Sequence, residues 1–190
     1  MKRVVIVHGW HGYPEKCWFP QTKKSLEEKG FKVAIPQMPE NDLVALPNWL
    51  NELKNIVGFP NSDLFLIGHS LGCITILKFL EQLKDDEKIG GVILVAGFTE
   101  SLGSGYEELD NFVEKPLDFK NLKTKAKFFT AIHSDNDPIV SSKYGSIFKD
   151  KLGAKLIIMH NMNHFSGNPG DPRIITSLPE VTNEILRMSK

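Results

Sequence analysis

The feature that most constrains this 190-residue sequence is an apolar run at residues 64–67 that leads directly into the motif G-H-S-L-G at residues 68–72. A second apolar run with helical spacing follows, so the pattern predicts a strand, a sharp turn and a helix over about residues 71–83. Such a turn lifts the Ser70 hydroxyl above the edge of a sheet, and its crowded backbone needs the two flanking glycines. A serine that only caps the helix would not need both glycines. We therefore predict that Ser70 is a nucleophile.

The rest of the chain repeats the alternation of a short apolar run with a helical pattern. Apolar runs rich in β-branched residues are typical of buried strands. The expected strands lie at residues 4–7, 31–35, 64–67, 90–97, 126–132 and 155–159, and the expected helices at 19–29, 46–56, 71–83, 106–113, 143–152 and 179–187. Because each return to a parallel strand needs a crossover, this order predicts an α/β fold of about six parallel strands with helices on both faces. We expect a single domain over residues 1–190.

Composition and charge exclude several classes of partner. Lys and Arg together number 23, as do Asp and Glu, so the chain as a whole has no electrostatic attraction for nucleic acid or for an anionic membrane. The first apolar run, at residues 4–7, is far too short for a signal peptide or a membrane span. Cys17 and Cys73 form no CxxC motif, which suits a reducing compartment. We therefore expect a soluble, cytoplasmic protein in which Cys73 is a small buried residue rather than a catalytic thiol.

A serine nucleophile needs a histidine to accept its proton and a carboxylate to hold that histidine. In a doubly wound sheet the loops after the carboxyl ends of the strands meet in one crevice. The loop after the fifth expected strand offers Asp135 and Asp137, and the loop after the sixth offers His160 and His164. We favour Asp137 over Asp135 as the carboxylate that holds the histidine. Asp137 is followed by a proline and two apolar residues that could anchor the loop, whereas Asp135 is a natural loop cap. We favour His164, which lies further along its loop, over His160, which ends a strand and should be held by packing.

Two backbone groups complete the expected site. The N–H of Leu71 begins the helix after the nucleophile, and the N–H of Trp10 belongs to the glycine-rich loop after the first strand. We expect both to bind the negative charge that develops on the substrate oxygen. Two further histidines, His69 and His133, are read as satisfied structural residues.

A metal site is a weaker interpretation of the same histidines. The pairs His8/His11 and His160/His164 have ligand-like spacing, but no helix brings the first pair onto one face. A metal hydrolase would also leave the turn around Ser70 unexplained. We therefore expect neither a metal nor a cofactor.

Seven short motifs occur in order along almost the whole chain. They are V-V-I-V-H-G at residues 4–9, W-F-P at 18–20, Q-M-P at 37–39, G-H-S-L-G at 68–72, V-I-L-V-A-G-F at 92–98, D-P-I-V at 137–140 and H-F at 164–165. Together they resemble the small α/β-hydrolases related to retinoblastoma-binding protein nine and its bacterial YdeN-type relatives. The resemblance implies a three-layer α/β-hydrolase fold without a large cap, and a Ser-Asp-His triad at Ser70, Asp137 and His164. One departure is Asn163, where the family more often has glycine.

These observations predict a serine hydrolase that cleaves carboxylic esters, or amides, of small substrates through an acyl-Ser70 intermediate. A small apolar pocket is expected from partial cover by residues 98–127 and from four aromatic residues, Trp10, Tyr13, Trp18 and Phe165. Thioester cleavage or aminopeptidase-like hydrolysis by the same triad is one alternative. The other is a protein-binding module with little or no catalysis, which has no reason to retain all three triad residues. Nothing in the sequence supports carrying over the protein partner in the family name.

Overall fold

Short segments far apart in the chain pair as strands of one parallel sheet. The computed structural model describes residues 1–39, 44–166 and 174–190. Its strands are β1 (Arg3–Val7), β2 (Lys32–Ala34), β3 (Leu64–His69), β4 (Gly91–Val95), β5 (Phe129–Ser134) and β6 (Lys155–Met159). Their order across the sheet is β2-β1-β3-β4-β5-β6, and every neighbouring pair is parallel. The expected parallel sheet is confirmed.

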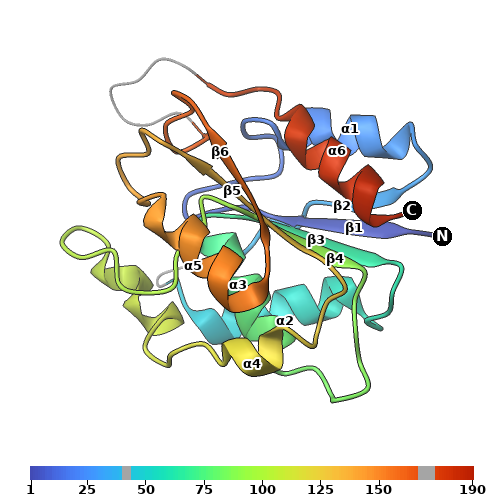
Figure 1. Ribbon diagram of the computed structural model, residues 1–190, viewed down its shortest axis with the longest axis horizontal. Coiled ribbons are helices and arrows are strands. Elements are labelled where there is room, and N and C mark those ends of the chain that lie inside the picture. Colours follow the sequence, from blue (N-terminus) through green and yellow to red (C-terminus); the bar gives the residue numbers. More distant parts are fainter. Residues whose placement is uncertain (40–43, 167–173) are drawn as a thin grey trace.

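Helices cover both faces of this sheet. They are α1 (Phe19–Glu27), α2 (Leu46–Val57), α3 (Leu71–Leu80), α4 (Phe119–Leu122), α5 (Lys143–Leu152) and α6 (Pro179–Met188), with a 3-10 helix η1 (Glu107–Phe112). Figure 1 shows α1 and α6 on one face, and α2, α3, α4 and α5 on the other. Proline stands in the first turn of α1, α2 and α6, where its missing N–H costs no hydrogen bond.

The sheet is buried on both faces because its inner strands are apolar at nearly every position. In β3 Leu64 and Leu66 belong to the core cluster shared with α2 and α3, whereas Phe65 and Ile67 belong to the cluster shared with α1 and α6. Successive side chains of a strand point to opposite faces, so one continuous apolar run supplies both cores. The loops that follow β1, β3, β5 and β6 leave the same edge of the sheet, where a site can form.

Some element boundaries differ from the expected ones. The fifth strand, expected at residues 126–132, is β5, which runs on to Ser134 because His133 and Ser134 pair with β6. Helix α3 ends at Leu80, short of residue 83. The single turn α4 was not predicted, since so short a helix leaves little periodic signal. Among the helices described, none is long and apolar enough to cross a membrane.

Candidate active site

Ser70 lies on a strained turn between β3 and α3. Its backbone angles, φ 52° and ψ −117°, lie in a region that residues with side chains rarely adopt. A Cβ on Gly72 would lie 2.2 Å from the Val7 carbonyl oxygen, and one on Gly68 would lie 2.7 Å from the Cys73 Cα. Neither position therefore has room for a side chain. Ser70 stands at the N-cap position of α3, but its side chain makes no capping hydrogen bond. Helix capping does not account for this serine.

The loop after β1 packs closely against the same turn. A Cβ on Gly9 would lie only 3.1 Å from the Ser70 Cβ. His8 holds this loop, because its Nε2 accepts a hydrogen bond from the Met38 N–H at 3.0 Å and its Nδ1 lies 2.7 Å from the Gly9 carbonyl oxygen. Burial lowers the pKa of His8, which keeps the ring neutral and this pattern intact. With both nitrogens engaged, His8 supports the loop rather than a metal ion.

His164 and Asp137 form a buried pair. His164 Nδ1 lies 2.8 Å from Asp137 Oδ2, and the two side chains are 7% and 1% exposed. The other carboxylate oxygen of Asp137 accepts hydrogen bonds from the backbone N–H groups of Ile139 and Val140, at 2.9 and 3.0 Å. The carboxylate is thereby held in one orientation, with its second oxygen directed at the imidazole. In a neutral imidazole this contact places the proton on Nδ1 of His164 and leaves the lone pair on Nε2.

Asp135 and His160, the alternatives to this pair, contact each other at the surface. The Asp135 carboxylate bonds to the His160 ring and accepts a hydrogen bond from the Asn161 N–H at 3.0 Å. The Asn161 N–H, followed by the His160 ring, lowers the pKa of Asp135. We expected packing to hold His160, and this was wrong. Its side chain is 87% exposed, because β6 lies at the edge of the sheet.

Polar side chains join the loop of Asp137 to the loop of His164. Ser134 Oγ accepts a hydrogen bond from the Met162 N–H at 3.0 Å, and Asn136 Oδ1 accepts one from the Asn163 N–H at 2.9 Å. Asn163 adopts a left-handed φ of 48°, a conformation that asparagine tolerates better than most residues, which explains how it replaces the family's glycine. Sequence reasoning missed these contacts. The asparagines that recur in both loops were the one feature of the sequence that could have indicated these contacts.

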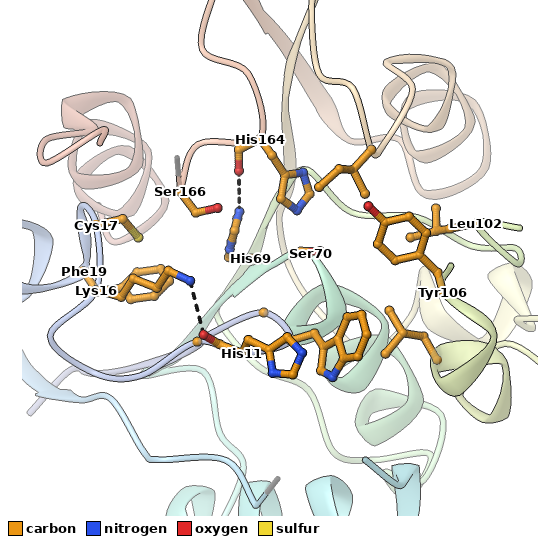
Figure 2. A pocket seen from close by; sticks show the side chains of 15 residues that line it. His11, Lys16, Cys17, Phe19, His69, Ser70, Leu102, Tyr106, His164 and Ser166 are labelled. Atoms are coloured by element: carbon orange, nitrogen blue, oxygen red, sulfur yellow. Dashed lines mark hydrogen bonds between the residues drawn. The ribbon is translucent and has the colours of Figure 1, made fainter. Parts of the chain in front are cut away.

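Two buried histidines flank the pair. His69 Nε2 donates a hydrogen bond to the His164 carbonyl oxygen at 2.8 Å (Figure 2), and burial is the main cause that holds the His69 pKa well below its usual value. His69 is thus a satisfied, neutral residue, as predicted, and it supports the backbone of His164. His133 is also fully buried, but neither of its ring nitrogens has a hydrogen-bond partner among the described residues. The prediction of a satisfied histidine was wrong at His133.

Ser70 and His164 line the same pocket, a hollow of about 290 Å³. Figure 2 shows the His164 ring pointing toward Ser70 from above. Within the described part of the chain no hydrogen bond joins the Ser70 hydroxyl to this ring. Trp10 also lines the pocket, and Leu71 follows Ser70 directly at the start of α3.

The apolar wall of the pocket differs from the one predicted. Of the four aromatic residues expected there, Trp10 alone is among the described lining residues. Tyr13 is 49% exposed, whereas Trp18 and Phe165 are fully buried in the core. The wall is formed instead by Leu102, Tyr106, Leu109 and Ile139, with Phe19 across the pocket from Leu102 and Tyr106. The first three of these belong to the partial cover expected at residues 98–127.

Neither a reactive thiol nor a metal cluster is found at this site. Burial raises the pKa of Cys17, which lines the pocket, to about 12, and burial raises that of Cys73 as well. Thiols with such pKa values are almost wholly protonated and are poor nucleophiles at neutral pH. The described residues contain no group of three or more His, Cys, Asp or Glu side chains placed to hold a metal ion.

Comparison with known proteins shows the family to which this chain belongs. The family model described as serine hydrolase matches residues 4–180. The chain belongs to the serine hydrolase family. It is 34% identical to the protein YdeN of Bacillus subtilis over 180 residues, which cover 95% of this chain and 92% of that protein. It is 25% identical to the serine hydrolase RBBP9 of Rattus norvegicus over 162 residues, or 85% of this chain and 80% of that one.

The fold comparison leads to the same family. The crystal structure of the B. subtilis ydeN gene product matches with a TM-score of 0.91 and 33% identity over 100% of both chains. The protein is therefore an enzyme, a serine hydrolase with the α/β-hydrolase fold, and the resemblance seen in its motifs is confirmed.

Proposed function

We propose that this serine hydrolase cleaves carboxylic esters of small substrates through an acyl-Ser70 intermediate. The observation that carries the proposal is the convergence in one pocket of Ser70, on its strained turn, and of His164, backed by the buried Asp137 carboxylate. Amides would follow the same course with an amine as the leaving group. The proposed steps need neither a metal nor a cofactor.

In the first step Ser70 Oγ attacks the carbonyl carbon of the ester while His164 Nε2 accepts the hydroxyl proton. Asp137 stabilises the imidazolium that forms, and because its side chain is 1% exposed, water screens this attraction little. The bond from the carbonyl carbon to the alcohol oxygen then breaks, and His164 returns the proton to the departing alcohol. A water molecule next attacks the acyl-enzyme in the same way, which releases the acid and restores Ser70.

The backbone N–H groups of Leu71 and Trp10 are the proposed donors to the oxyanion. Leu71 begins α3, where the first N–H groups lack acceptors within the helix and the helix dipole is positive. Trp10 follows Gly9, whose close approach brings its loop to Ser70. Within the described residues neither N–H donates to another backbone carbonyl, which supports this role. A donor of this kind contributes about a hundredfold to a thousandfold in turnover.

The size of the pocket favours a small substrate. Its volume of about 290 Å³ lies at the lower end of the range of roughly 300–1,000 Å³ usual for ligand pockets. Its apolar wall would exclude water from the reacting atoms, which strengthens the electrostatic contacts within.

A fluorophosphonate probe tests the nucleophile without a known substrate. Wild-type protein should gain the mass of one phosphonyl group on Ser70, since the probe reacts with activated serines. Ser70→Ala should not be labelled, and His164→Ala and Asp137→Asn should each be labelled at least about a thousandfold more slowly. Asp135→Asn is the matched control. It removes a neighbouring carboxylate that pairs with the exposed His160, and it should be labelled at the wild-type rate.

Three outcomes would change the assignment. A folded wild-type protein that is not labelled would contradict the proposal and favour the protein-binding module. Slow labelling of Asp135→Asn together with normal labelling of Asp137→Asn would transfer the role of orienting and stabilising the histidine from Asp137 to Asp135. Equal labelling of the wild type and His164→Ala would exclude His164 as the base. Circular dichroism of each variant verifies that it is folded.

A further inference from the structure

The pocket around Ser70 has two chemically different sides. Figure 2 shows Leu102 and Tyr106 on one side of Ser70, and Lys16, Cys17 and Ser166 on the other. The side of Leu102 and Tyr106 is mainly apolar and contains the Tyr106 hydroxyl. The other side presents the Lys16 ammonium and the Ser166 hydroxyl, next to the Phe19 ring and the Cys17 thiol. A substrate whose carbonyl lies at Ser70 extends toward both sides, so each side selects a different end of the molecule.

Lys16 is the residue that distinguishes the polar side. It is the one Lys, Arg, Asp or Glu among the described residues that line the pocket. Its Nζ points into the pocket and donates a hydrogen bond to the His11 carbonyl oxygen at 3.2 Å (Figure 2). An ammonium has three donors, and Nζ makes no ion pair with a carboxylate in the described part of the chain. Lys16 can therefore still bind an anion.

The surroundings of Lys16 strengthen its interaction with a ligand. The side chain is half-buried and its Nζ lies 5.9 Å from the centre of the Tyr13 ring. A charge beside apolar walls acts in a lower effective dielectric than a charge in open water. The Lys16 ammonium also contributes, after burial and the neighbouring His164, to the lowered pKa of His69, which lines the same pocket.

We propose that the substrate carries an anionic group, a carboxylate or a phosphate, that binds the Lys16 ammonium, and an apolar group that fills the opposite side of the pocket. The inference rests on the proposed ester hydrolysis at Ser70. Because Ser70 lies between the two sides, the anion and the apolar group belong to opposite ends of the ester, one in the acyl part and one in the alcohol part. Substrates that carry an ammonium group, such as aminoacyl amides, are disfavoured because Lys16 repels them.

Matched pairs of esters test this inference. In the first pair, p-nitrophenyl valerate and the p-nitrophenyl monoester of glutarate differ by a carboxylate at the end of the acyl chain. In the second pair, phenyl butyrate and p-carboxyphenyl butyrate differ by a carboxylate in the alcohol part. The ratio of kcat/KM within each pair is measured by chromatography for the wild type and for Lys16→Met, Lys16→Arg and Lys24→Met. Intrinsic reactivity of the esters cancels when ratios are compared between variants.

The wild type should prefer the anionic ester, relative to Lys16→Met, by about tenfold in one of the two pairs, as expected for a partly screened ion pair. The pair that responds identifies which part of the ester lies beside Lys16. Lys16→Arg should retain the preference because it retains the charge. Lys24→Met should also retain it, since Lys24 is exposed on α1 and does not line the pocket. Added salt should reduce the preference.

The failures of the two proposals are distinguishable. If the wild type and Lys16→Met hydrolyse every ester in the same ratio, the anionic substrate is refuted while ester hydrolysis stands. If Lys16→Met lowers kcat/KM equally for the neutral and the anionic ester, Lys16 only stabilises its loop and the inference also fails. If the folded wild type hydrolyses no ester and no fluorophosphonate labels it, the proposed function itself fails.

Discussion

Mild acid should destabilise this protein, because His133 is buried and its ring has no hydrogen-bond partner among the described residues. The ring is 0% exposed, and burial lowers its pKa from 6.5 to about 4. In the unfolded chain the same ring has a pKa of about 6.5. Between these two pH values the unfolded state binds a proton that the folded state does not. The free energy of unfolding therefore falls as the pH is lowered through this window.

The size of the effect follows from the two pKa values. A lowering from 6.5 to about 4, at about 1.4 kcal/mol for each pH unit, amounts to roughly 3 kcal/mol of unfolding free energy. His8 and His69 are buried with lowered pKa values and act in the same direction. The free energy of unfolding of a small protein is about 5–15 kcal/mol. The amount lost through the titration of His133 alone is therefore a substantial part of this free energy.

Urea unfolding of the wild type and of His133→Leu, measured at several pH values from about 7.5 down to about 4, isolates this contribution. The leucine changes packing equally at every pH. The difference in unfolding free energy between the two proteins therefore varies with pH only through the titration of His133. Across this range the variant should gain roughly 3 kcal/mol on the wild type. Parallel curves for the two proteins would refute the assignment of a buried, unpaired and neutral His133.

Two further predictions concern close packing. Gly72→Ala should lower the melting temperature by at least about 5 °C, because the new Cβ would lie 2.2 Å from the Val7 carbonyl oxygen. A variant that melts in a calorimeter at the wild-type temperature would contradict this close approach of α3 to the end of β1. In the native protein Cys17 and Cys73 should react with Ellman's reagent far more slowly at neutral pH than in the urea-unfolded chain, because burial raises the pKa of both thiols. Rapid reaction of either native thiol would show that it is accessible.

The turn between β3 and α3 that holds Ser70 could be predicted from the local sequence. The steric demands of a strand that reverses into a helix act over a few residues, and the two glycines beside Ser70 meet them in the structure as they do in the sequence. Continuous apolar runs likewise predicted the buried strands, since a strand covered on both faces has no polar alternation. Helix α5 and strand β6 lie within the expected limits.

The sequence narrowed the choice of the proposed triad carboxylate and histidine to two residues each but did not decide between them. Each loop offered two residues of the right type, and spacing alone gave a preference. In the structure Asp137 is buried, with one oxygen on backbone N–H groups and the other on His164, whereas Asp135 pairs with the exposed His160. Which carboxylate contacts which histidine depends on how the loop after β5 packs against the loop after β6. These two loops are separated by about a whole helix and strand in the sequence.

Sequence alone determined the order of strands and helices, the parallel sheet and the position of the turn that carries Ser70, because these follow from periodicity and from short-range steric rules. Only the tertiary structure decided the pocket walls, the unpaired burial of His133, the exposure of His160 and the entry of Lys16 into the pocket. Those features depend on burial and on neighbours from distant parts of the chain, and no local pattern of residues records which distant side chains will meet.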